Sequence, residues 1–300
     1  MPVDTLLFRT AQIAARIRAG ARSREFYDRE GRSWWIYHSR PPAVCCDPGV
    51  PIVFLHGFGN DGRTWFPFFP PFRHNRELVS VDIPGFGRSE LLPADDPTPS
   101  WYADRLSFLL QDFVVRWGQP PIIVGKSMGG MLAGLVAARE PNLVRALLLV
   151  APAGVETPTV SPFWSEWASR GRNMLLPADA AEYAAMIRLL YERPVRIPGF
   201  VRRVVLREID ARRDHYRWIF ERLLAEGYDP LGGRLRDITT PTVLVHGEHD
   251  RIVDPSIRRV FSDRFPRARI DMVPACGHSP TRERREAVIG ALVDILSRYG

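Results

Sequence analysis

Short runs of Val, Ile and Leu recur along most of the chain and are separated by longer stretches with helical periodicity. These runs lie at residues 52–55, 78–81, 122–124, 147–150, 242–245 and 270–273. Continuous apolar runs of this length are typical of strands that are buried on both faces, and parallel strands need crossover connections such as helices. The pattern therefore predicts an α/β fold with a mostly parallel sheet flanked by helices.

The first residues have a different spacing of apolar positions. Between residues 5 and 19, Leu6, Ile13 and Ile17 fall on one helical face, and the opposite face is polar. This spacing predicts an amphipathic helix, which we assign to an N-terminal segment of residues 1–24. Two interpretations stay open: the helix docks on the body of the protein, or it makes a peripheral contact with an anionic membrane surface.

A β-hairpin is predicted over residues 25–39. Two extended runs flank Arg29-Glu30-Gly31, where glycine can adopt the positive φ that a tight turn needs. With the apolar runs that follow, this hairpin belongs to a core composed of residues 25–151 and 237–300.

The interval 152–236 contains no convincing buried strand and is rich in Trp, Phe, Tyr and Arg. Helices are predicted at residues 177–192, 199–213 and 215–226. Because Thr240-Pro241 then returns the chain to a strand-like run, we interpret residues 152–236 as a helical cap inserted into the α/β core.

Composition narrows the function classes. The chain has 300 residues, 45% of them apolar, and a net charge of +7 that comes almost entirely from arginine, since Lys126 is the only lysine. The arginines are spread over all regions and accompany no recognisable nucleic-acid-binding module, so we expect no nucleic-acid partner.

The three cysteines, Cys45, Cys46 and Cys276, form neither a disulfide framework nor a zinc-ligand pattern. No apolar run of about 18 residues and no secretory signal is present. We therefore expect a cytoplasmic protein that begins near Met1 and has the N-terminal helix as its one candidate membrane contact.

The sequence Gly125-Lys126-Ser127-Met128-Gly129 has the pattern G-x-S-x-G. The pattern alone is weak, but here it joins a predicted strand at 122–124 to a helix-forming run at 131–139, the context of a nucleophile elbow. Ser127 is the predicted nucleophile. The alternative is an ordinary glycine-rich connection between a strand and a helix.

A serine hydroxyl needs a base to remove its proton. His278 is the predicted base, because it follows the last strand-like run in a loop that contains Gly and Pro. His56, His246 and His249 also lie near strand ends, but His56 and His246 close their strands and are expected to pack there.

The imidazole in turn needs a carboxylate that fixes its tautomer. Asp250 follows the strand at 242–245 and gives the chain order Ser, acid, His. Glu248 and Asp254 are rivals on the same loop, and either could instead be a surface charge or a helix cap.

An acyl-transfer intermediate also needs N–H donors for its oxyanion. We predict the backbone N–H of Met128, beside the nucleophile, and that of Phe58 in the glycine-containing loop after the first buried strand. The alternative is that these glycines only end a strand.

Taken together, five motifs resemble those of α/β-hydrolase fold proteins, and the likeness extends from about Glu25 to the C-terminus. They are His56-Gly57-Phe58-Gly59, Asp82 to Ser89, Gly125 to Gly130, Gly247 to Arg251, and Gly277-His278. The resemblance implies that Asp82 to Ser89 form a structural turn near the site and have no catalytic role. It also separates the chain from dehalogenases and epoxide hydrolases of this fold, which have an aspartate in place of Ser127.

Within that family, Tyr191 to Pro198 and the Arg-rich helix after them resemble bacterial lipases and monoacylglycerol-lipase-like esterases. This implies an apolar pocket for an acyl chain. The predicted substrate-binding residues are Trp65, Phe163, Trp164 and Trp167, with Phe58, Phe66, Phe68 and Phe69 nearby. The alternative is that these rings are core and cap packing.

The expected function is hydrolysis of a carboxylic ester, with an acyl or monoacylglycerol substrate, through an acyl-enzyme on Ser127. No ligand cluster or nucleotide-binding fingerprint is present, so no metal or organic cofactor is expected. Carbon–carbon bond hydrolases of the meta-cleavage type, amidases and perhydrolases could use the same residues. A ligand receptor on a hydrolase scaffold is the alternative outside enzymes.

Overall fold

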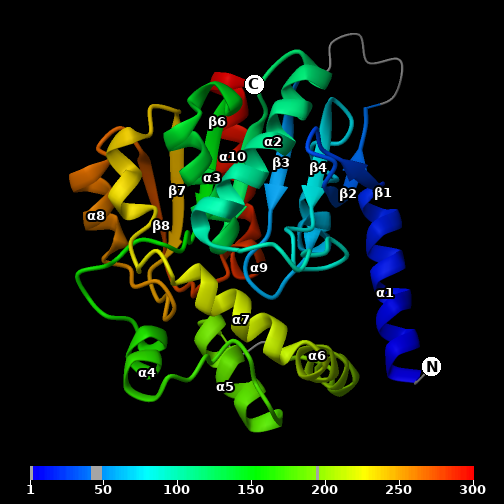
Figure 1. The fold of residues 1–300 in the computed structure, drawn as a ribbon, viewed down its shortest axis with the longest axis vertical. Coiled ribbons are helices and arrows are strands. Elements are labelled where there is room, and N and C mark those ends of the chain that lie inside the picture. The colour runs from blue at the N-terminus through cyan, green and yellow to red at the C-terminus, as the bar shows by residue number, and fades with distance from the viewer. Residues whose placement is uncertain (1–2, 42–48, 194–195) are drawn as a thin grey trace.

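The computed structural model describes residues 3–41, 49–193 and 196–300. Cys45, Cys46 and part of the Tyr191 to Pro198 segment lie outside these residues. Eight strands form one sheet in the order β1-β2-β4-β3-β5-β6-β7-β8 (Figure 1). Their bounds are β1 Arg22–Tyr27, β2 Ser33–Ser39, β3 Gly49–Leu55, β4 Arg76–Val81, β5 Ile122–Lys126, β6 Ala146–Val150, β7 Thr242–Gly247 and β8 Arg269–Val273.

The predicted fold class is confirmed, because strands β3 to β8 pair in parallel. All six apolar runs lie within them. Every residue of the central strands β5 and β6 is buried, whereas β8, at the sheet edge, is only half-buried. Central parallel strands are covered on both faces, which explains their unbroken Val, Ile and Leu content.

The first two strands form the antiparallel part of the sheet. β1 and β2 pair from Arg22 with His38 to Tyr27 with Ser33, and Gly31 in the turn has a φ of 74°. The predicted hairpin is thus present, but it begins at Arg22. Residues 22–24, which the sequence analysis placed with the N-terminal helix, therefore belong to the sheet.

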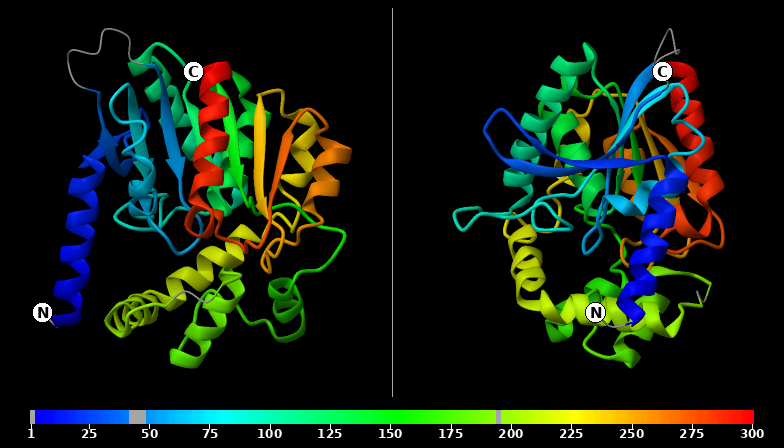
Figure 2. Two further views of the ribbon diagram at one scale, coloured as in Figure 1. Left: turned by 180° about the vertical axis from the view of Figure 1, so that it is seen from behind. Right: turned by 90° about the vertical axis from the view of Figure 1, so that its right-hand side faces the viewer.

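Helices cover both faces of the sheet (Figure 2). One hydrophobic cluster packs helices α2 Pro99–Trp117, α3 Met128–Arg139 and α8 Ile257–Arg264 on one face. The other cluster packs helix α10 Arg285–Tyr299 and the aromatic segment 65–72 on the opposite face. The short helix α9, Pro280–Glu283, precedes α10.

Four helices connect β6 to β7 and lie below the sheet in the view of Figure 1. They are α4 Pro162–Arg170, α5 Ala180–Leu190, α6 Gly199–Ala211 and α7 Arg213–Leu223. We call them the helical layer. Three of them match the predicted helices within a few residues, and α4 was not predicted. Among the described residues between β6 and β7 there is no strand.

Side-chain and backbone contacts fix the helical layer to the loop after β7. The Phe163 N–H donates to the carbonyl of Arg251 at 3.1 Å, and the Arg251 guanidinium donates to the carbonyl of Arg188 at 2.9 Å. The same guanidinium pairs with Glu192 at 2.6 Å. The layer is therefore attached to the strand ends that are expected to carry the catalytic groups.

Helix α1, Val3–Ala19, lies against the body of the protein, but not through the apolar face seen in the sequence. Ala15 and Ala19 pack on the core, while Leu6, Ile13 and Ile17 are exposed. At the far end of the helix, Asp4 pairs with Arg203 of α6 at 2.7 Å. None of the helices in the described part of the chain is both long and apolar enough to span a membrane.

Candidate active site

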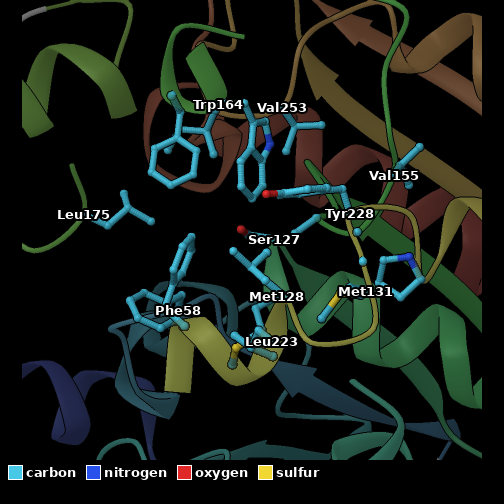
Figure 3. Close-up of a pocket in the computed structure, with 18 residues that line it drawn as sticks. Phe58, Ser127, Met128, Met131, Val155, Trp164, Leu175, Leu223, Tyr228 and Val253 are labelled. Carbon is cyan, nitrogen blue, oxygen red and sulfur yellow. The ribbon is translucent and has the colours of Figure 1, made fainter. Parts of the chain in front are cut away.

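Ser127 lies at the turn between β5 and α3 in a strained backbone conformation. Its φ of 52° and ψ of −117° are rare for a residue with a side chain. Neighbouring strands and loops hold it there: the Ser127 N–H donates to Val150 at 2.9 Å, and its carbonyl accepts from Ala153 at 3.0 Å. The turn directs the side chain away from the sheet and into a cavity (Figure 3).

The glycines around Ser127 are required by close backbone contacts. A Cβ on Gly125 would lie 2.4 Å from the carbonyl oxygen of Gly129. A Cβ on Gly129 would lie 2.5 Å from the carbonyl oxygens of both Leu55 and His56. These separations are far below van der Waals contact, so the G-x-S-x-G spacing is a steric requirement of this turn.

Asp250 and His278 are brought together from two neighbouring loops. The His278 Nδ1–H donates to Asp250 Oδ2 at 2.8 Å, and both side chains are buried. The other carboxylate oxygen accepts the N–H groups of Ile252 at 2.8 Å and Val253 at 3.0 Å. An acid held by two backbone donors fixes the imidazole so that its Nε2 faces away from the acid.

The electrostatics keep Asp250 ionised. Burial alone would raise the pKa of its carboxyl group, but the charge and hydrogen bond of His278 outweigh burial, so the pKa lies below its usual value. His246, whose Nε2 lies 3.4 Å from Asp250 Oδ2, adds to this effect. Sequence reasoning gave His246 only a packing role.

The two rival carboxylates lie elsewhere. Glu248 is exposed. Asp254 accepts the N–H of Ser256 at 2.9 Å within its own turn. Neither forms a hydrogen bond with His278 among the described residues.

The loop after β3 is held by His56. Its Nδ1–H donates to Gly57 at 2.8 Å, and its Nε2 accepts the N–H of Ile83 at 3.0 Å. Burial lowers the pKa of His56 to about 4, so the ring is neutral and can accept this bond at neutral pH. His56 thereby fixes the loop that presents the Phe58 N–H.

Met128 is the first residue of α3, and the N–H groups of a first helical turn have no partner within their own helix. The Asn60 N–H donates to the Gly57 carbonyl at 3.2 Å and closes a turn that contains Phe58. This hydrogen bond does not involve the Phe58 N–H. Both candidate oxyanion donors are therefore on fixed backbone beside Ser127, whose Cβ would lie 3.2 Å from a Cβ on Gly57.

An apolar cavity of about 80 Å³ adjoins Ser127 (Figure 3). Among the residues that the structure describes, none that lines this cavity is charged. Phe163 and Trp164, two of the predicted substrate-binding residues, contribute to its walls together with residues that the sequence analysis did not single out. These include Met131, Val155, Leu175, Leu223, Leu224, Tyr228 and Val253.

Two predicted substrate-binding residues lie elsewhere. Trp65 is fully buried in the core and packs on Phe54, with ring centroids 5.2 Å apart, so its assignment to the substrate pocket was wrong. Phe66, Phe68 and Phe69 are in the same core cluster. Trp167 lines a separate cavity and packs on Phe220, with ring centroids 4.9 Å apart. A tryptophan of the core and a tryptophan of the pocket look alike in the sequence, so only their packing in the structure distinguishes them.

A second, larger cavity of about 610 Å³ lies between the core, the helical layer and α1. Phe58 and Leu175 line both cavities. Its other walls include Lys126, which precedes Ser127, and Ser279, which follows His278. No group of three or more His, Cys, Asp or Glu side chains in the described ranges is arranged to hold a metal ion.

Comparison with known proteins identifies the family of the chain. The model of the alpha/beta hydrolase family matches residues 52–291. The chain belongs to the α/β hydrolase family. The match includes Ser127, Asp250 and His278 and the loop after β3.

Curated relatives of this α/β hydrolase are named as lipases. Monoacylglycerol lipase abhd6-A of Xenopus laevis is 28% identical over 82% of this chain and 75% of its own length. Lipase 3 of Moraxella sp. is 26% identical over 78% of this chain and 73% of its own length. The expectations of a lipase-like family and of a carboxylic ester hydrolase are confirmed.

Solved structures extend the likeness to the whole fold. A bacterial membrane phospholipase A has a TM-score of 0.88 and 25% identity, and the alignment covers 99% of this chain and 92% of that one. The 2-hydroxy-6-oxo-6-phenylhexa-2,4-dienoate hydrolase of Rhodococcus sp. has a TM-score of 0.73 and 21% identity, covering 93% and 99%. The latter shows the shared fold alone.

Proposed function

We propose that this α/β hydrolase cleaves the ester bond of an acylated glycerol-type lipid through a Ser127, His278 and Asp250 triad and a covalent acyl-enzyme. The observation that carries the proposal is the buried pair of His278 and Asp250, 2.8 Å apart, together with a strained Ser127 that lines an uncharged cavity. The lipase relatives support the same substrate class.

In the first step Ser127 Oγ attacks the ester carbonyl while His278 Nε2 takes its proton. The resulting oxyanion accepts the N–H groups of Phe58 and Met128. The tetrahedral intermediate collapses, His278 returns the proton to the departing alcohol oxygen, and an acyl-enzyme remains. Asp250 holds the imidazole in place and stabilises its charged form.

In the second step water replaces the alcohol. His278 takes a proton from the water as its oxygen attacks the acyl carbonyl, and then returns a proton to Ser127 Oγ as the carboxylic acid leaves. No residue beyond the triad and the two oxyanion donors is needed for this chemistry.

The apolar cavity is proposed to hold the acyl chain. Its volume of about 80 Å³ favours short acyl groups over long ones. The helical layer, the predicted cap of residues 152–236, supplies Phe163, Trp164 and Leu223 to its walls. We propose that this layer selects the acyl group.

The test is hydrolysis of p-nitrophenyl esters from two to sixteen carbons by the wild type and by Ser127→Ala. We expect an optimum at the short end of the series and a loss of kcat of roughly 10⁶ in the variant. Comparable activity in the variant would exclude Ser127 as the nucleophile. A folded wild type with no ester activity would redirect the reaction to carbon–carbon or amide substrates, or to a receptor.

The exposed face of α1 is proposed to contact a lipid membrane from the surface. Val3, Leu6, Leu7, Ile13 and Ile17 are all exposed and follow one another along the outer face of this helix. Arg9, Arg16 and Arg18 flank them, which suits an anionic surface.

Co-sedimentation with anionic vesicles tests this contact. The double variant Leu6→Asp/Ile13→Asp is expected to remain in the supernatant, whereas the wild type sediments. Val115→Asp, on an exposed residue of α2, is the matched control and should sediment like the wild type. Equal sedimentation of all three proteins would contradict the proposal.

A further inference from the structure

The larger cavity is lined by the chain neighbours of the nucleophile and the base, although neither Ser127 nor His278 itself lines it. Lys126 directly precedes Ser127, Ser279 directly follows His278, and all of Lys126, Ser279 and Phe58 line this cavity. In the acyl-enzyme mechanism the base returns its proton to the leaving oxygen, so the alcohol must lie on the side of His278. The apolar cavity contains no residue of the His278 loop. The larger cavity is therefore the place for the alcohol.

Lys126 is an unusual residue for such a wall. It is the only lysine of the chain, and its side chain is nine-tenths buried. Its Nζ donates to Ser279 Oγ at 3.1 Å, and no described carboxylate lies within ion-pair distance of it. An ammonium has three N–H donors, so two are available to a ligand. A buried cation that has only a neutral partner normally destabilises the folded protein. An anionic ligand that pairs with Lys126 would explain why a lysine stands at this position.

The charge of Lys126 persists at neutral pH. Burial lowers its pKa to about 8, while Asp250, Cys276 and Glu283 act in the opposite direction and Arg282 adds to the lowering. Its hydrogen-bond partner, the Ser279 hydroxyl, is neutral. The amine is therefore mostly protonated below pH 8.

Two arginines extend the positive charge to the mouth of the cavity. Arg282 and Arg285 line it and are exposed, and neither pairs with a carboxylate of the described residues. The Arg282 guanidinium lies over the ring of Tyr191, 5.7 Å from its centroid.

One of the two carboxylates that line the cavity is paired with another arginine, since Asp61 pairs with Arg63. Glu208 forms no ion pair among the described residues, and burial raises its pKa. The group of Lys126, Arg282 and Arg285, which we call the cationic cluster, forms an ion pair with neither carboxylate in the described part of the chain.

We infer that the cationic cluster binds a phosphate on the leaving alcohol, so that the enzyme prefers acylated glycerol phosphates to neutral acylglycerols. This inference rests on the proposed function. Arginine guanidinium groups match phosphate oxygens in pairs, and a buried ammonium adds a strong point charge. The alcohol would then leave as a glycerol phosphate.

The experiment compares octanoyl glycerol with octanoyl glycerol 3-phosphate, both kept below their micelle concentrations. The measured quantity is the ratio of kcat/KM for the phosphorylated ester to that for the neutral one. We expect a ratio of at least tenfold for the wild type at low salt and a decrease as the salt concentration rises.

The decisive variants change that ratio. Arg282→Gln/Arg285→Gln and, separately, Lys126→Met are each expected to lower the ratio about tenfold, the effect of losing charge-assisted hydrogen bonds. Because both arginines are exposed, the first variant does not threaten folding even if Lys126→Met does. Arg298→Gln, at an exposed position of helix α10, removes one positive charge as Lys126→Met does, and as the control it should keep the wild-type ratio.

Two results would overturn the inference: a wild-type ratio near one, or a high ratio that the double arginine variant leaves unchanged. Inorganic phosphate separates a lipid headgroup from a free anion. We expect it to compete only at concentrations far above the KM of the phosphorylated ester, and binding as tight as that of the lipid would assign the site to free phosphate. Failure of the proposed function is distinct, since neither ester would then be hydrolysed.

Discussion

The two cavities beside the reaction centre share Phe58 and Leu175 but differ in charge. The smaller one has no charged residue in its lining, whereas the larger one contains Asp61, Arg63, Lys126, Glu208, Arg282 and Arg285. An uncharged wall suits a hydrocarbon chain, and charged groups at a mouth suit a polar alcohol. The difference indicates that the enzyme recognises the two halves of its ester by separate physical means.

The largest expected effect concerns the triad, which serves both cavities equally. Asp250→Asn should lower kcat by about 10⁴, because the amide no longer holds the working tautomer of His278. The loss should be the same for neutral and phosphorylated esters in steady-state assays. Asp254→Asn, in the neighbouring turn, is the control with near wild-type kcat. A similar loss in both variants would mean that the loop, and not the acid, is responsible.

The next effect concerns the turn that separates the cavities. Gly129→Ala would place a Cβ 2.5 Å from the carbonyl oxygens of Leu55 and His56, so the backbone must shift. We expect a loss of about 3 kcal/mol or more in the free energy of unfolding, measured by urea denaturation, together with a loss of activity.

Gly290→Ala is the matched control for that variant. Gly290 lies in helix α10, and a Cβ there would have no neighbour within 4 Å. We expect it to be neutral or to stabilise the protein by up to about 1 kcal/mol, since alanine favours helix more than glycine does. Equal destabilisation by both substitutions would exclude a special role for the turn.

A third prediction tests the buried charge of Lys126, in the larger cavity, through the pH dependence of the free energy of unfolding. The pKa of Lys126 is about 8 in the folded protein and near 10.5 when unfolded, so between these values the unfolded chain binds more protons. The contribution of Lys126 to the free energy of unfolding should therefore rise from pH 8 to pH 10.5, by about 3 kcal/mol at most. Lys126→Met should lack this rise. Parallel pH profiles of the two proteins would contradict the buried charge.

The smallest effect concerns the apolar cavity alone. Leu224→Trp should fill part of its volume and lower kcat/KM for medium-chain relative to acetyl p-nitrophenyl esters by about tenfold. The phosphate preference should not change, because Leu224 lines only the smaller cavity. Leu92→Trp, at an exposed position, is the control. A changed phosphate preference in Leu224→Trp would mean that the cavities act as one.

Much of the fold followed from local patterns. Runs of Val, Ile and Leu identified the parallel strands, because burial on both faces leaves no place for polar residues. The turn at Ser127 was recognisable because the pattern G-x-S-x-G joins a strand-like run to a helix-forming run. Gly125 meets Gly129 within the turn, whereas Gly129 meets Leu55 and His56 at the end of another strand. Helix α4 was missed, although Ser161 caps it, Pro162 begins it and Gly171, with a φ of 61°, ends it. Its aromatic content was interpreted as pocket lining instead.

The ends of the predicted strands indicated which loops carry the acid and the base, but not which of three acids pairs with His278. Asp250, Glu248 and Asp254 are equivalent acids in the sequence, and the structure separates them because only Asp250 meets His278 and two backbone donors. Trp65 and Trp164 are likewise equivalent by residue type, yet one packs under the sheet and the other faces the cavity. The role of each acid and each tryptophan therefore depends on which helices and strands pack around it.

The sequence by itself determined the strands, the turn at Ser127 and the chemical character of the groups near it, because these depend on neighbours in the chain. Tertiary structure decided which face of α1 stays exposed, which aromatic rings reach the cavity, and that Lys126, Arg282 and Arg285 surround one space. Those arrangements join residues more than a hundred positions apart, and no local pattern of polarity encodes such contacts.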